Sequence, residues 1–211
     1  MFDRLNHAGA ARGFTLIELM IAVVVMGVLL AIAVPNKGAW MVSTKARSAS
    51  EFYLEGFMMA RRQAVTHNGA SRIVLTANAG NGQLDWQVDI CFPVPGTPCD
   101  DTSGVWSTTT TQAGNDPEGA AGFTSVFRSA TSLPPSETLA PSVLPVGATA
   151  VYYTPLGWVD TNVTRVTQLR FDPNARYAHD VPVAAVAVSL AGMPSKCDPT
   201  KAAGDSRACP P

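Results

Sequence analysis

The chain has 211 residues, of which 46% are hydrophobic and 15% charged, and its formal net charge at pH 7 is −1. A chain of this size and composition can bury one ordinary hydrophobic core. Its near-zero net charge argues against a large basic surface for nucleic acid, although it leaves room for a local basic patch.

A long apolar segment follows a short polar start. Residues 1–13 contain Arg4 and Arg12, and residues 19–34 are apolar without interruption. Together with residues 14–17, this run approaches the ~20 residues that cross a bilayer. The basic residues precede the run, so the positive-inside rule predicts a cytoplasmic start and an exported remainder. The roughly 175 residues that follow suit one globular domain.

A glutamate, Glu18, lies near the head of this apolar run. A full charge in hydrocarbon costs several kcal/mol, so such a residue is a functional hypothesis by default. One interpretation is a secretory signal peptide, cleaved at the A-x-A site of residues 31–33 to release a chain starting at Val34. The other is a cut before the run, between Gly13 and Phe14, which keeps the run. We favour the second, because an ordinary signal peptide gives no reason for a glutamate here.

Residues 13–35, GFTLIELMIAVVVMGVLLAIAVP, resemble the type IV prepilin signature, in which Gly-Phe precedes Thr-Leu-Ile-Glu-Leu and an apolar helix. In that family a membrane-embedded prepilin peptidase cuts after the glycine and methylates the new N-terminus. The resemblance implies that residues 1–13 are a removed leader, that Gly13 precedes the cut and that Phe14 becomes N-methylated. It also implies that residues 14–35 form a transmembrane or filament-core helix and that Glu18 acts in assembly.

Physical reasoning gives Glu18 a partner. In a helix that starts at Phe14, Glu18 lies one turn, about 6 Å, from the N-terminal amine. A lone carboxylate in an apolar setting takes up a proton or finds a cation. Cleavage creates such a cation, which is the new ammonium of this chain or of a neighbouring subunit. We therefore expect that Glu18 is tolerated because processing creates its partner.

Residues 36–68 continue with a helical pattern. Small and aromatic side chains recur at three- and four-residue spacing and form one stripe: Ala49, Phe52, Tyr53, Gly56, Phe57, Ala60 and Ala64. Asn68 and Gly69 predict the end of the helix. A continuous helix from Phe14 to His67 would be about 80 Å long. One small domain cannot cover that length, so lipid or other copies of such helices must surround its first half.

Residues 69–211 have the pattern of a β-rich domain. Five segments rich in β-branched and aromatic residues predict strands: SRIVLTA, QLDWQVDIC, ATAVYYTP, RVTQLRFDP and VPVAAVAVSLAG. A helix followed by strands predicts an α+β domain with an antiparallel sheet packed on the helix, as in pilin-like folds. Residues 93–147 are rich in Ser, Thr, Gly and Pro and predict a long loop. Trp106, Phe123 and Phe127 either form a binding surface in it or, as we favour, pin it to the sheet.

The four cysteines form two close pairs, Cys91 with Cys99 and Cys197 with Cys209. Neither pair has the spacing of a zinc knuckle or a thioredoxin-like motif. Behind a membrane segment, an oxidising compartment with two disulfides is the better interpretation. Four cysteines allow three pairings, and the sequence alone does not choose among them. Because short loops close at the lowest entropic cost, we expect the disulfides Cys91–Cys99 and Cys197–Cys209.

A second, looser resemblance covers most of the exported domain. Ala60, Arg61 and Ala64 match an Ala-Arg-x-x-Ala pattern late in the helix of the GspH/FimT group. The stretches YYTPLGW and AVAVSLAG are similar to that group's later strand and glycine motifs. We expect Arg61 and Arg62 themselves to lie on a solvated helix face.

Some FimT-like pilins bind DNA, and the family associates this with a Gly-Arg-x-Arg stretch near the C-terminus. This chain has LAGMPSKCDP there, with Met193 and Ser195 in place of the arginines and Lys196 nearby. Phosphate contacts need clustered cations. We therefore expect no strong DNA binding, although Lys201 and Arg207 keep this alternative open.

No catalytic or metal-binding motif is found. The sequence lacks the G-x-S-x-G, G-x-x-x-x-G-K-[ST] and H-E-x-x-H patterns. Its histidines, His7, His67 and His179, are scattered, and His179 beside Asp180 is more typical of a solvated turn than of a catalytic dyad. We expect no enzymatic activity, no cofactor and no metal site.

These features predict a minor pilin of a type IV pilus, processed by the prepilin peptidase and incorporated in or priming the filament. We expect a single-pass inner-membrane protein with its globular domain in the periplasm, and later a component of the pilus fibre at the cell surface. Its expected partners are the peptidase, other major and minor pilins and the inner membrane. Two alternatives stay open: a minor pseudopilin of type II secretion, and a DNA-binding pilin of natural transformation.

Overall fold

Two helices begin the part of the chain that the computed structural model describes, which is residues 13–33 and 37–210. Helix α1 spans Leu16–Ala33 and helix α2 spans Lys37–His67. The expected leader up to Arg12 and the junction at residues 34–36 lie outside the described residues. Residues 1–38 and 39–211 form two separate units.

Helix α1 begins later than expected. Its first residue is Leu16, so Phe14 and Thr15 precede the helix. In the uncut chain the helix therefore starts two residues after the Phe14 expected for the mature chain, and the reason is a helix cap described below. Apart from Glu18, the sequence of α1 is apolar on every face.

Helix α2 is amphipathic, as the stripe of small and aromatic residues predicts. The members Ala49, Tyr53, Phe57, Ala60 and Ala64 are all fully buried. Gly56 lies in the same stripe, and a Cβ on it would lie 2.8 Å from Ile73 Cδ1 and 3.0 Å from Trp86 Cδ2. The glycine thus lets the helix approach the first sheet closely.

Asn68 and Gly69 end α2 as predicted. Asn68 adopts a left-handed conformation with a φ of 50°. The N–H of Gly69 then turns back to the carbonyl of Ala64 at 3.2 Å. This is the usual way in which a left-handed residue satisfies the last carbonyls of a helix.

Two antiparallel four-stranded sheets follow α2, where the sequence predicts one. The first has the order β3-β2-β1-β5 and consists of β1 (Ala70–Ala77), β2 (Leu84–Cys91), β3 (Val126–Arg128) and β5 (Ala150–Tyr153). The second has the order β4-β6-β7-β8 and consists of β4 (Leu139–Leu144), β6 (Gln168–Pro173), β7 (Ala184–Val188) and β8 (Pro194–Cys197).

The stretch 93–147 is not a single loop. It contains a short 3₁₀ helix at Gly119–Ala121 and the two strands β3 and β4. The prediction of a long irregular loop is therefore wrong for the second half of this stretch. Strands β3 and β4 have only three and six residues and show no clear alternation of apolar and polar side chains. They are strands because they pair with β2 and β6.

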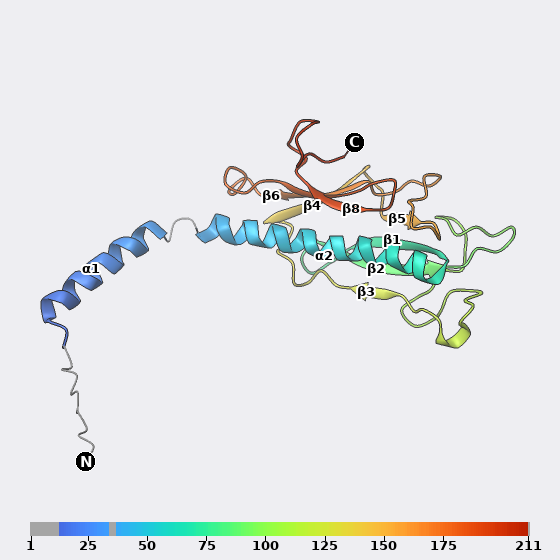
Figure 1. Ribbon diagram of the computed structural model, residues 1–211, viewed down its shortest axis with the longest axis horizontal. Coiled ribbons are helices and arrows are strands. Elements are labelled where there is room, and N and C mark those ends of the chain that lie inside the picture. Colours follow the sequence, from blue (N-terminus) through green and yellow to red (C-terminus); the bar gives the residue numbers. More distant parts are fainter. Residues whose placement is uncertain (1–12, 34–36, 211) are drawn as a thin grey trace, which may run out of the picture. The chain divides into compact units, whose positions relative to one another are not determined.

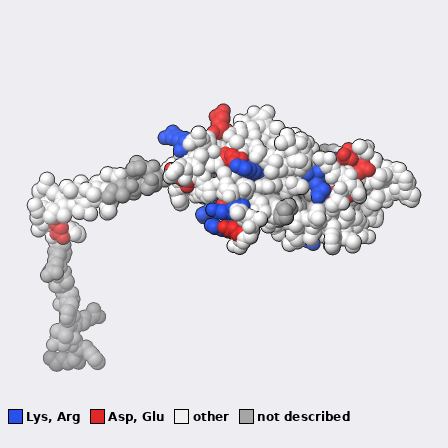
Figure 2. Space-filling view, turned by 90° about the horizontal axis from the view of Figure 1, so that it is seen from above, with Lys and Arg blue, Asp and Glu red and all other residues white. Residues whose placement is uncertain are grey.

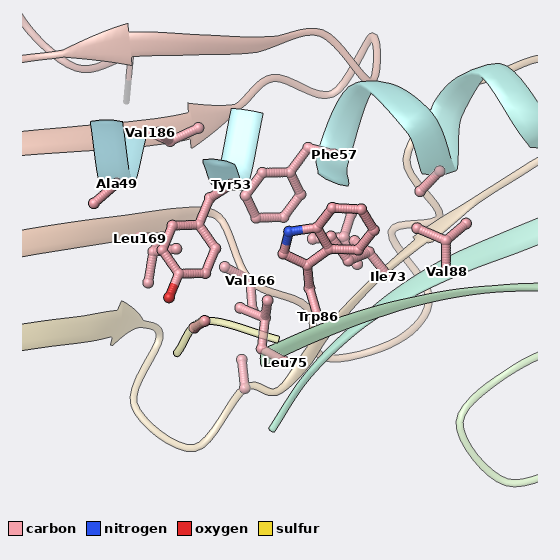
Figure 3. Close-up of a cluster of buried hydrophobic side chains, with 14 of the residues drawn as sticks. Ala49, Tyr53, Phe57, Ile73, Leu75, Trp86, Val88, Val166, Leu169 and Val186 are labelled. Carbon is pink, nitrogen blue, oxygen red and sulfur yellow. The ribbon is translucent and has the colours of Figure 1, made fainter. Parts of the chain in front are cut away.

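Helix α2 packs against both sheets, and the core lies where they meet it (Figures 1 and 3). The ring of Tyr53 stacks on Phe171 of β6 at 5.3 Å, and its hydroxyl donates to the carbonyl of Leu84 at 2.8 Å. The ring of Phe52 meets Trp86 of β2 at 5.8 Å, and the Trp86 indole N–H donates to the Phe52 carbonyl. One helix therefore supplies the core of both sheets, which confirms the α+β prediction.

Candidate processing and assembly site

A helix cap sets the start of α1. Oγ1 of Thr15 accepts a hydrogen bond from the backbone N–H of Glu18 (3.3 Å), and the Thr15 carbonyl accepts one from the N–H of Leu19 (3.1 Å). Thr15 and Glu18 have the S/T-x-x-E spacing of a capping box, and an acidic residue in the first turn favours the helix dipole. Thr15 thus has a capping role that our interpretation of the sequence missed, although the pattern T-x-x-E before an apolar run signals it.

The bond between Gly13 and Phe14 lies outside the helix. Both residues have non-helical backbone, and the Phe14 side chain is 84% exposed. A Cβ placed on Gly13 would meet nothing within 4 Å. An exposed, non-helical segment is the kind of backbone that a peptidase can bind in extended form. The predicted cleavage site is thus accessible in this conformation.

The large apolar side chains of α1 are exposed in the isolated chain. Their exposed fractions run from 51% at Val25 to 77% at Leu16. A helix that is apolar on every face is normally buried, by lipid or by other protein. Among the described residues, no helix is both long enough and apolar enough to cross a membrane.

Residues 9–34 match the family described as the prokaryotic N-terminal methylation motif. This match supports a type IV pilin-like prepilin, a subunit of a pilus or pseudopilus. It includes Gly13, Phe14 and Glu18, the three residues that the sequence analysis assigns to processing and assembly. No curated protein matches the chain, and no solved structure matches it.

The unit formed by residues 39–211 contains both of the expected disulfides. Cys91, the last residue of β2, is bonded to Cys99, and Cys197, the last residue of β8, is bonded to Cys209. The Cα–Cα distances are 6.0 and 4.7 Å. Each disulfide therefore ties the start of an irregular segment to the end of a strand.

Trp106 pins the segment after Cys99 to the first sheet. Its ring meets Tyr152 of β5 edge to face at 5.9 Å, and the guanidinium of Arg72 lies 4.3 Å above it. Arg72 also pairs with Asp89 of β2 at 2.8 Å, and the Asp89 side chain is only 1% exposed. For Trp106, the interpretation as a loop pin is confirmed.

The other candidate residues, Phe123, Phe127 and His179, do not form a common site. Phe123 packs against the ring of His67 at 5.5 Å, whereas Phe127 is 48% exposed on β3. His179 is fully exposed and lies 3.3 Å from the carboxylate of Asp180, as in a solvated turn. Within residues 13–33 and 37–210, no cluster of three or more His, Cys, Asp or Glu residues could hold a metal ion.

Arg61 lies at a junction that sequence reasoning did not find. Arg62 is exposed, as expected, but Arg61 is half-buried and its Nε is buried without a hydrogen-bond partner. A Cβ on Gly157 would lie 3.3 Å from Arg61 Cγ, and one on Gly192 would lie 3.3 Å from Arg61 Cδ. The prediction of a solvated face is therefore wrong for Arg61. The Ala-Arg-x-x-Ala, YYTPLGW and AVAVSLAG segments meet at this one side chain.

Proposed function

We propose that this chain is a minor pilin of a type IV pilus. Prepilin peptidase cuts it between Gly13 and Phe14 and methylates Phe14, and the mature subunit is incorporated in the filament or primes it. The observation that carries this proposal is the methylation motif at residues 9–34, in which Glu18 becomes the fifth residue of the mature chain.

The geometry of α1 supports a role in assembly. Its apolar side chains are exposed in the isolated chain, so lipid before assembly, and parallel helices of other pilins in the filament, would cover them. Before assembly, the inner membrane holds the subunit, with its globular domain in the periplasm. The Glu18 carboxylate then pairs with the N-terminal ammonium of its own chain or of a neighbouring subunit.

The same chain features suit a minor pseudopilin of type II secretion, since both machines use a methylated N-terminal helix. The genes that flank this one would distinguish the two assemblies. In either assembly, we propose that the chain acts as a structural subunit without enzymatic activity, cofactor or metal.

The charge distribution favours a subunit that does not bind DNA. Lys196 forms an ion pair with Glu51, and the guanidinium of Arg207 pairs with Asp205 at 3.0 Å. The hydrogen bond from the Arg207 side chain lowers the pKa of Asp205 to about 2, so this carboxylate stays charged at neutral pH. On the face that Figure 2 shows, basic and acidic side chains lie in mixed groups. Mixed groups of this kind weaken the field that would attract phosphates.

Intact-mass measurement of the protein recovered from its own cells tests the proposal. We expect a chain that starts at Phe14 and carries one additional methyl group. Gly13→Val, which places a branched side chain next to the scissile bond, is expected to leave the leader attached. A wild-type chain that starts at Val34 would overturn the proposal and restore the signal-peptide interpretation.

A further inference from the structure

A groove lies beside the last turns of α2, in the unit formed by residues 39–211. Its volume is about 510 Å³, within the range of sites that hold ligands or side chains of a partner. One wall is α2 itself, and the other comes from the turn after β5 and the turn before β8. The residues that line it include Met58, Arg61, Arg62, Val65, Leu156 and Met193.

The walls of the groove are apolar and open to solvent. The exposed fractions are 53% for Met58, 49% for Val65, 76% for Leu156 and 53% for Met193. Large apolar side chains that share one hollow on a folded domain are typical of a protein-interaction site. Scattered single exposed residues would carry no such meaning.

A backbone hydrogen bond holds together the two turns that form the outer wall. Gly157 and Gly192 have φ values of 75° and 76°, in the left-handed region that favours glycine. The N–H of Val159 donates to the carbonyl of Leu190 at 3.1 Å and thereby joins the two turns. A groove with such walls is formed before a partner arrives, which lowers the entropic cost of binding.

Two arginines give the groove a positive charge. Among the described residues, neither Arg61 nor Arg62 forms an ion pair with a carboxylate, and Arg61 Nε is buried without a partner. The hydroxyl of Tyr153, in the strand that leads into the first turn, is also buried without a partner. Buried N–H and O–H groups normally form hydrogen bonds. We therefore expect a bound partner to supply an acceptor for the Arg61 Nε–H, which lies beside an open groove. The nearest acidic residues of α2, Glu51 and Glu55, line an adjoining hollow that shares Met58 and Arg62 with the groove. Glu51 forms its ion pair with Lys196.

We infer that this groove binds a segment of a different pilin-type subunit, one that places a carboxylate beside a large apolar side chain. The inference rests on the proposed function, in which a minor subunit has other pilins as its neighbours. The carboxylate accepts hydrogen bonds from Arg61 and Arg62, and the apolar side chain packs against Leu156 and Met193. A polyanion such as DNA would need several cations along one face, whereas this groove has two arginines and apolar walls.

Site-specific photocrosslinking in the full chain tests the inference. A benzophenone amino acid at Leu156, in cells that assemble the fibre, is expected to crosslink to another pilin-type protein. Mass spectrometry should place the crosslinked residue within a few positions of an Asp or Glu. Arg62→Gln should lower the yield about tenfold, the effect expected when a charge-assisted hydrogen bond is lost, and Arg62→Lys should lower it less. Arg62 is exposed, so neither change should affect folding.

Arg165→Gln is the matched control, because Arg165 lines a different hollow and its loss should leave the yield unchanged. Crosslinks only to lipid, to DNA or to a second copy of this chain would overturn the inference. So would a crosslinked segment without a carboxylate, or a yield that Arg62→Gln leaves unchanged. The same cells provide the mass of the mature chain and its amount in sheared fibres. A chain that starts at methylated Phe14 and is present in fibres, but shows no charge-dependent crosslink, would remove the groove inference and leave the proposed function standing.

Discussion

Thr15 and Glu18 allow the cap of α1 to be separated from the charge that we assign to assembly. Glu18→Gln removes the carboxylate charge, but glutamine serves at this position of a capping box almost as glutamate does. Thr15→Ala does the reverse, because it removes the Oγ1 acceptor that lies 3.3 Å from the Glu18 N–H and keeps the charge. The pair of variants therefore tests the two roles independently.

The two changes should differ in size. Loss of an N-cap hydroxyl costs about 1 kcal/mol of helix stability. Removal of one partner from a buried ion pair costs about 3–5 kcal/mol, because the remaining charge is left without compensation. These energies correspond to a decrease in the amount incorporated into fibres of roughly fivefold for Thr15→Ala and of a hundredfold or more for Glu18→Gln.

The assay is quantitative immunoblotting of the protein in sheared fibres, divided by its amount in the membrane fraction. We expect Glu18→Gln to be present in the membrane and nearly absent from fibres, and Thr15→Ala to be present in both. Thr15→Ser keeps a hydroxyl and should behave as the wild type. Normal incorporation of Glu18→Gln together with loss of Thr15→Ala would refute the reasoning, because the cap at Thr15 and not the charge of Glu18 would then control assembly.

Three further predictions concern the globular domain. Gly56→Ala should lower the free energy of unfolding by about 1 kcal/mol in a denaturant titration, since overpacking against Trp86 exceeds the gain in helix propensity; a stabilised variant would contradict the close approach of helix and sheet. A non-reducing peptide map should show Cys91 bonded to Cys99 and neither of them bonded to Cys197 or Cys209. A disulfide between the two pairs would contradict the structure. The full chain should show no duplex-DNA binding near physiological salt, and binding that is lost when Lys201 and Arg207 become alanine would reverse our assignment.

The sequence predicts those parts of the fold that repeat with a regular period. The stripe on α2 recurs every three or four residues, and its members are buried as predicted because the period matches the helix. Alternation predicts β1 equally well, with Ser71, Ile73 and Leu75 buried in turn. The left-handed end at Asn68 follows from local backbone preference alone.

The elements that escape prediction depend on pairing with distant segments. Strand β3 has three residues and becomes a strand only because Val126 to Arg128 pair with β2. Strand β4 contains Pro141, which sequence reasoning assigns to loops, but β4 is an edge strand and an edge tolerates a missing N–H donor. The division into two sheets is likewise invisible, since it depends on which strands pair and not on their individual patterns.

The candidate sites divide in the same way. The cleavage site and Glu18 can be predicted because they belong to one short segment, and even the missed cap at Thr15 follows from a local pattern. Arg61 could not be placed, because a helix pattern shows only which face a residue occupies. The aliphatic part of its side chain lies against two turns that are distant in sequence. Each turn contains a glycine with positive φ, Gly157 in one and Gly192 in the other. They meet at one arginine because the turn after β5 of the first sheet contacts the turn between β7 and β8 of the second, through the hydrogen bond from Val159 N–H to the Leu190 carbonyl. The groove therefore depends on how the two sheets pack and requires the folded domain.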